Sequence, residues 1–187
     1  MQQQYCRVIN LGMKRFAGPL IAAALLASCG ERTAPSAVDV CSADAVRADV
    51  VAALAEVTRA TRAKDIDAYM RLVPEESVID DTSGELVDRD QLRANVLRDW
   101  AIIPETLRLE HVVGDVTMNG CDEAVVMVDQ TWERTMLRPN SEPGTDRILT
   151  TQRHREIWRR TADGWRGFEI EELGGEIYVN GARYGAN

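Results

Sequence analysis

The chain has 187 residues, of which 22 are basic and 30 acidic, giving a formal net charge of -8 at pH 7. An acidic chain is poorly suited to nucleic acid, whose phosphates are bound by Lys and Arg side chains. The length fits one domain with a sizeable core and a short leader. We therefore expect one folded domain and no nucleic-acid partner.

Residues 1–28 have the pattern of an export signal. Lys14 and Arg15 precede an apolar run over residues 16–27, like the charged and hydrophobic regions of a signal peptide. The run is about a dozen residues long, whereas a helix that spans a bilayer needs about 20. A buried N-terminal helix is the alternative, and the placement of the charges favours a signal peptide.

The signal ends in Leu-Ala-Ser-Cys at residues 26–29, which resembles the bacterial lipobox. There the cysteine thiol is alkylated by a diacylglyceryl group, so lipidated Cys29 would be the mature N-terminus. Gly30 follows where an aspartate would indicate inner-membrane retention. We expect a protein on the periplasmic side of a bacterial envelope, at the outer membrane, that contacts the membrane through its lipid. Residues 29–40 predict a flexible tether.

Cys41 and Cys121 remain once Cys6 is removed with the signal and Cys29 is lipidated. In an oxidising periplasm a disulfide between them would stabilise the fold by on the order of 4 kcal/mol. Two separate buried thiols are the alternative, because a sequence does not give their distance. Neither a cluster of metal ligands nor a phosphate-binding loop is found, so we expect no metal and no cofactor.

Three helices are predicted in the first half of the domain by capping residues and by apolar residues at helical spacing. Ser42 begins a long amphipathic helix. Asp65 begins a shorter one that ends before Pro74. Asp88 and Gln91 have the spacing of a capping box. The apolar face of the third helix would consist of Leu92, Val96, Leu97 and Trp100.

The rest of the domain alternates apolar and polar residues, as strands do. A short strand is predicted at residues 77–81, before a turn at Gly84. Asn119-Gly120 is the strongest hairpin signal. Four longer strands are predicted at residues 107–116, 124–137, 148–160 and 165–173. Helices followed by an antiparallel meander indicate an α+β fold.

Four local motifs accompany this order of elements: Lys-Asp-Ile-Asp-Ala-Tyr-Met at 64–70, Pro-Glu-Glu-Ser-Val-Ile-Asp-Asp at 74–81, Asp-Arg-Asp-Gln-Leu at 88–92 and Asp-Gly-Trp-Arg at 163–166. With them the chain resembles the nuclear transport factor 2-like (NTF2-like) superfamily, which includes ketosteroid isomerase and the SnoaL-like cyclases. The resemblance implies a cone-shaped domain at residues 41–180, with N-terminal helices packed on a curved antiparallel sheet, and a tail at 181–187. Such cones serve enzymes, binders and interaction modules, so the fold leaves the function open.

Strand alternation predicts which side chains face the interior of the cone. In residues 148–160 one face carries Arg153, Arg155 and Arg159, and we assign it to solvent or to a partner. The other face mixes apolar, aromatic and polar groups, as an amphipathic cavity does. The expected pocket lining is Tyr69, Trp100, Val126, Val128, Gln130, Trp132, Gln152, His154, Glu156 and Trp158.

The resemblance also implies positions for catalytic groups. The general-base aspartate of the isomerases corresponds to Asp81, and their protonated acid lies near Glu156. Their tyrosine corresponds to a position near Val57, which has no hydrogen to donate, so steroid-type isomerisation is not expected. Gln152 and His154 are alternative polar groups for the same cavity. A histidine beside a carboxylate resembles the acid and base groups of dehydratases and cyclases.

A purely structural interpretation of these residues stays open. Asp81 would then end a strand and bind turn amides, and His154 and Glu156 would make ordinary cross-strand polar pairs.

The last long strand is ambiguous in its register. The family pattern would point Glu169 and Glu171 inward, whereas burial of Phe168 and Ile170 would point both glutamates outward.

We therefore carry three functional hypotheses. The favoured one is a non-enzymatic envelope lipoprotein whose cone binds a small apolar or amphipathic ligand. The second is a SnoaL-like isomerase, cyclase or dehydratase that uses Asp81 with His154 or Glu156. The third is an assembly module that docks a second copy or an envelope protein through its arginine-rich face.

Overall fold

Helices and short strands come first in the domain, and long strands follow. The computed structural model describes residues 41–139 and 142–185, so the predicted signal peptide, lipidated Cys29 and tether lie outside the described residues. The first elements are α1 (Ala43–Ala63), α2 (Ile66–Met70), β1 (Val78–Asp80), β2 (Leu86–Asp88) and α3 (Arg89–Ile102). The later strands are β3 (Glu105–Asn119), β4 (Glu123–Leu137), β5 (Thr145–Thr161), β6 (Gly164–Val179) and β7 (Ala182–Arg183).

The helix starts were correctly predicted, because capping is a local interaction. The Ser42 hydroxyl accepts a hydrogen bond from a first-turn amide of α1 at 3.1 Å. Asp65 caps α2 in the same way. Asp88 and Gln91 form a complete capping box at α3. Each cap satisfies amides that a helix N-terminus otherwise leaves free. No helix in the described part of the chain is long and apolar enough to cross a bilayer.

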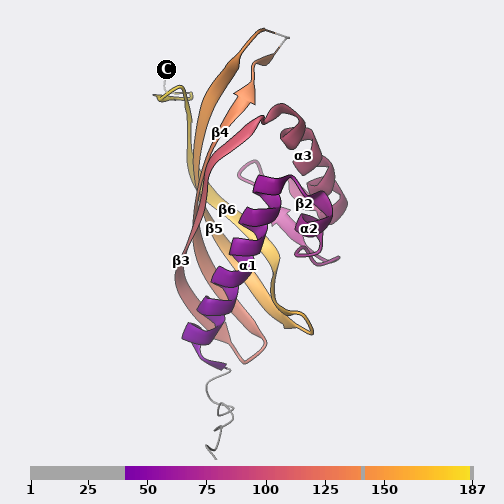
Figure 1. Cartoon of the computed structure of the whole chain (residues 1–187). Helices are drawn as coiled ribbons and strands as arrows, with labels where there is room; N and C mark the ends of the chain where they lie inside the picture. The colour runs from indigo at the N-terminus through magenta and orange to yellow at the C-terminus, as the bar shows by residue number, and fades with distance from the viewer. Residues whose placement is uncertain (1–40, 140–141, 186–187) are drawn as a thin grey trace, which may run out of the picture. The chain divides into compact units, whose positions relative to one another are not determined.

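Seven strands form one sheet within the described residues, in the order β2-β1-β6-β5-β4-β3, with β7 also paired to β6. The meander β3 to β6 is antiparallel, as predicted. The parallel pairing of β1 with β6, which aligns Ile79 with Ile170, was not predicted, and neither was β2. Figure 1 shows α1 along one face of the long strands, with α2 and α3 on the same side. The architecture is the α+β cone that the sequence predicts.

The core lies between α1 and the long strands. Val46 and Val50 of α1 are fully buried, and so are Val126 and Val128 of β4. The same cluster contains Ala53, Leu54, Ala124, Trp158 and Trp165. Val126 and Val128 were predicted to line the pocket, whereas the structure packs them against α1. In α3 only Trp100 is buried, and Leu97 of its predicted apolar face is 39% exposed.

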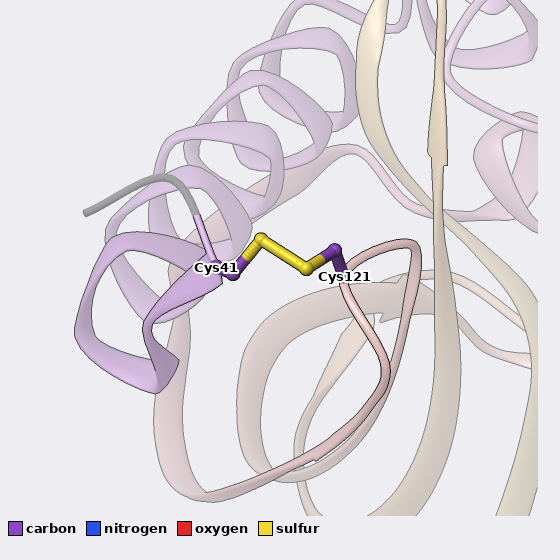
Figure 2. The surroundings of a disulfide bond; sticks show 2 residues. All are labelled: Cys41 and Cys121. Carbon is purple, nitrogen blue, oxygen red and sulfur yellow. A yellow bond between two sulfur atoms is a disulfide. The ribbon is translucent and has the colours of Figure 1, made fainter. Parts of the chain in front are cut away.

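A disulfide joins the start of α1 to the turn between β3 and β4 (Figure 2). Cys41 and Cys121 lie 80 residues apart in sequence, and their Cα atoms are 5.0 Å apart. The predicted pairing is therefore present, and the alternative of two free thiols is wrong. The bond fixes the N-terminal end of α1 beside the hairpin.

The register of β6 decides the ambiguity left by the sequence. The side chains of Glu169 and Glu171 point away from the interior. On the outer face, Arg159 binds Glu169 at 2.8 Å and Arg155 binds Glu171 at 3.4 Å. Phe168 and Ile170 line the cavity described below. Burial of apolar residues therefore determines which face of β6 points inward. The family pattern, which would point Glu169 and Glu171 inward, is wrong here.

One close backbone approach in the sheet gives a stability prediction. A Cβ atom on Gly175 would lie 1.9 Å from the carbonyl oxygen of Thr151 on β5, whereas one on Gly167 would lie 3.6 Å from Trp158. We expect Gly175→Ala to lower the free energy of unfolding by about 1–3 kcal/mol, because strand backbone must move. Gly167→Ala serves as the control and should change it less. Urea titration of both variants checks this, and equal losses would contradict it.

Candidate functional site

A cavity of two adjoining chambers lies between the helices and the sheet. The apolar chamber, of about 130 Å³, has walls that include Leu72, Phe168 and Glu156. The polar chamber, of about 200 Å³, has walls that include Asp99 and Glu172. The residues shared by both chambers are Val57, Tyr69, Ile79, His111, Gln130, His154 and Ile170.

A buried polar group on β5 joins the two chambers. Glu156 is 3% exposed and His154 is 8% exposed. One Glu156 oxygen accepts a hydrogen bond from the Trp158 indole at 2.7 Å, and the other lies 3.4 Å from Nδ1 of His154. Beside an ionised carboxylate, which only accepts hydrogen bonds, Nδ1 is the His154 nitrogen suited to carry the proton. Nε2 of His154 then has no partner within the described residues.

A second polar feature crosses four strands and forms one side of the polar chamber. His111 of β3 binds the Gln130 oxygen of β4 at 3.1 Å, and the Gln130 amide donates to Gln152 of β5 at 3.2 Å. The Gln152 amide donates to Glu172 of β6 at 3.1 Å. We call these four residues the polar ladder. Its donors all point towards Glu172, so the ladder ends in a carboxylate.

The ladder also fixes the protonation of His111. Its Nε2 faces an oxygen that only accepts, so Nε2 carries the proton, and Nδ1 accepts from the Thr58 hydroxyl at 3.3 Å. Burial lowers the pKa of His111, against an opposing effect of the hydrogen bond to Gln130. Because a Thr hydroxyl can also accept, the lowered pKa is what favours the neutral imidazole, in which Nε2 donates and Nδ1 accepts.

Asp81 is not brought to the cavity. Its carboxylate accepts hydrogen bonds from the amide and hydroxyl of Ser83 at 2.8 and 2.6 Å, and from the amide of Glu85 at 3.0 Å. The Ser83 hydroxyl is the main cause that holds its pKa below the usual value. Asp81 lines neither chamber. Asp81 therefore binds the amides of the β1–β2 turn, as the purely structural interpretation predicted. On β1 it is Ile79 that faces the cavity.

The aromatic residues predicted to line the pocket lie around the two chambers. Tyr69 lines both, Trp158 lines the apolar chamber, and Trp100 and Trp132 line the polar one. Arg134 stacks over the Trp132 ring, with its guanidinium carbon 4.1 Å from the ring centre. His111, Asp99 and Glu172 were not predicted to line the cavity. The signal for His111 was the register of β3, which a bulge shifts, and the signal for Glu172 was alternation from Ile170. Asp99 lies on α3, where helical spacing from Val96 was the signal.

The arginine-rich outer face is internally paired. Arg155 binds Glu171 at 3.4 Å, and Arg159 binds Glu123 at 2.9 Å and Glu169 at 2.8 Å. Arg153 is 3.8 Å from Asp129. These carboxylates belong to the same sheet as the arginines. Among the described residues there is no group of three or more side chains that could hold a metal ion.

Tyr69 gives a pH prediction. Burial, and then the negative charge of Glu156, raise its pKa to about 12 from 10.0. Because the pKa is raised in the folded state, the contribution of neutral Tyr69 to the free energy of unfolding is complete below pH 10. It is lost as the pH rises towards 12. We expect wild-type protein to lose up to about 2 kcal/mol more than Tyr69→Phe over this interval. Chemical denaturation of both proteins at pH 9 and pH 12 measures the difference. Identical alkaline losses would show that Tyr69 does not titrate abnormally.

No protein-family model matches the sequence, and no curated protein matches it significantly. Solved structures match its fold. The Kfla4162 protein from Kribbella flavida is 21% identical with a TM-score of 0.57, over 72% of this chain and 95% of that chain. A hexachlorocyclohexane dehydrochlorinase of type 2 is 12% identical with a TM-score of 0.55, over 71% of this chain and 87% of that chain.

A protein of the NTF2-like family from Streptomyces avermitilis, described as a candidate dehydratase, is 16% identical with a TM-score of 0.50, over 70% of this chain and 99% of that chain. The domain therefore has the NTF2-like fold with an internal cavity. At these identities the similarity shows the fold alone, and the function has to be argued from the cavity.

Proposed function

We propose that the chain is an envelope lipoprotein whose domain binds a small, mostly apolar ligand in the cone cavity without converting it. The observation that carries the proposal is a cavity with apolar walls and a buried His154 nitrogen that lacks a partner within the described residues. Leaving such a group unpaired costs about 1–3 kcal/mol. A ligand that completes the hydrogen bond accounts for it, because buried polar atoms in native proteins normally have partners.

The residues of the cavity fit binding better than steroid-type isomerisation. Val57 lines both chambers near the position where the resemblance implies a tyrosine. Asp81, the implied base, is held by its own turn. Without the donor pair that stabilises an enolate oxygen, that reaction has no support from these side chains.

Two features support the envelope part of the proposal. The Leu-Ala-Ser-Cys sequence at residues 26–29 has the lipobox pattern, and the Cys41–Cys121 disulfide is a bond that persists in oxidising compartments. In a Gram-negative host fed labelled palmitate, we expect label on the wild-type chain and none on Cys29→Ala. An unlabelled wild-type chain would contradict the lipid anchor.

Ligand binding can be tested with a matched pair on α1. Val57 lines both chambers, whereas Val51 lies on the same helix and is 50% exposed. Native mass spectrometry of protein purified from its own envelope should show a retained small molecule for wild type and for Val51→Phe, and none for Val57→Phe. Retention by Val57→Phe would place the molecule elsewhere, and wild type without any would contradict binding.

The His154–Glu156 pair favours one second candidate, an elimination reaction. Nε2 of His154 would take a proton from carbon, the electron pair would form a C=C bond, and a leaving group would depart from the neighbouring carbon. Glu156, 3.4 Å from Nδ1, would stabilise the imidazolium formed. Two structural neighbours are described as a dehydrochlorinase and as a candidate dehydratase. Loss of mass from the retained molecule on incubation, abolished in His154→Gln, would select this function over binding.

A further inference from the structure

The charge of the cavity walls has one sign. Asp99 and Glu172 line the polar chamber and Glu156 lines the apolar one, and no Lys or Arg is among the described residues that line either chamber. Asp99 already has a cation, since Arg98 lies 3.3 Å away. Glu172 has no ion pair within the described residues, and its hydrogen-bond donor is the neutral amide of Gln152. The two oxygens of Glu156 face Trp158 and His154, so Glu172 is the carboxylate that keeps an oxygen for a ligand.

The polar ladder gives this carboxylate a fixed role. Each amide in the ladder uses its oxygen for the residue before it and its nitrogen for the residue after it. Rotating the side-chain amide of Gln130 or Gln152 by half a turn would exchange its oxygen and nitrogen and break both of its hydrogen bonds in the ladder. Because only one Glu172 oxygen accepts from Gln152, the other has capacity for a donor from the chamber.

His154 supplies a second acceptor to the same chamber. It is the direct partner of Glu172 across β5 and β6, and both residues line the polar chamber. Side chains of such partners lie about 5 Å apart at Cβ. In the neutral form, with the proton on Nδ1 beside Glu156, Nε2 is an acceptor without a donor. A protonated amine has three donors and no acceptor, which is the complement of these two groups.

The remaining walls suit a cation with an apolar body. Tyr69 and Trp100 line the polar chamber and meet edge to face with ring centres 5.9 Å apart. Aromatic faces attract ammonium groups. Val57 and Ile79 continue into the apolar chamber, where Leu72 and Phe168 offer a surface without charge.

From these contacts we infer that the ligand is an amphipathic amine, with its ammonium group between Glu172 and His154 and its apolar body in the apolar chamber. The inference rests on the proposed ligand-binding function and names the chemical class of that ligand. It assigns Glu172 as the residue that selects for positive charge.

Three probes of similar size that differ in charge test the inference. They are 2-phenylethylamine, 2-phenylethanol and 3-phenylpropanoate, each titrated calorimetrically into the full-length protein at pH 7. We expect the amine to bind at least about tenfold more tightly than the alcohol, as a charge-assisted hydrogen bond allows. The anion should bind most weakly. Equal affinities for amine and alcohol would overturn the inference, and so would binding of none of the three.

A matched pair of variants on β6 assigns the selectivity. Glu172→Gln should lose the preference for the amine and keep the affinity for the alcohol. Glu171→Gln, which lies on the outer face beside Arg155, should keep the preference. A preference that survives in Glu172→Gln would overturn the role of Glu172. If that variant does not fold, the wild-type comparison of amine with alcohol still decides, and the Val57→Phe measurement separately decides whether the cavity binds a ligand at all.

Discussion

Replacing both Cys41 and Cys121 with serine should lower the free energy of unfolding by about 4 kcal/mol. The bond closes a span of 80 residues that includes α1, α2, α3 and β3. Without it the unfolded chain gains conformational freedom, and the start of α1 is no longer fixed to the hairpin. Urea titration of the oxidised protein and of the double variant measures the difference.

The matching control is the wild-type protein under reducing conditions. Its midpoint should fall to that of the double serine variant, and the variant itself should not respond to reductant. A wild-type midpoint that stays constant on reduction would mean that the bond is absent or adds no stability. Since α1 contributes Leu54 and Val57 to the cavity, the reduced protein should also bind its ligand less tightly.

Local signals explain what the sequence predicted correctly about the fold. The caps at Ser42, Asp65 and Asp88 depend on hydrogen bonds within three residues. The turn at Gly120 has a positive φ of 73°, as its Asn-Gly pair suggests. The missed features depend on distant residues. The parallel pairing of Ile79 with Ile170 joins positions 91 residues apart (170 minus 79), and no local pattern encodes it.

Bulges explain why part of the site was missed. From the hairpin at Gly120, Val116 pairs with Val126, but after a register shift Val113 pairs with Val128. His111 therefore faces Gln130, although a continuous ladder would place it opposite Thr131. Glu172 was missed for another reason, because it continues the inward alternation of Phe168 and Ile170 and the sequence left that register open.

Strict alternation did hold on β5, where the cavity-facing residues were predicted. Thr150, His154, Glu156 and Trp158 are all buried. Their order along one strand face could be obtained from a period of two. The partner of His154 could not, because a bulge between Arg153 and His154 brings His154 opposite Glu172. Gln152 pairs with Gly175 in the register and reaches Glu172 only through its side chain.

Trp165→Ala should be as damaging as loss of the disulfide, lowering the free energy of unfolding by about 3–5 kcal/mol. Trp165 is 4% exposed and belongs to the core cluster of α1 and the long strands. Removing the indole leaves a void that close-packed neighbours cannot fill without strain. Denaturant titration measures the loss.

Trp132→Ala is the control, because Trp132 is part of a chamber wall beside Arg134 and lies outside the buried core. It should cost clearly less stability than Trp165→Ala and should weaken ligand binding more, since it removes part of the chamber wall. Trp158 belongs both to the core cluster and to the apolar chamber, so packing around Trp165 also supports the cavity. Equal stability losses in the two alanine variants would mean that the chamber wall contributes to the core as much as Trp165 does.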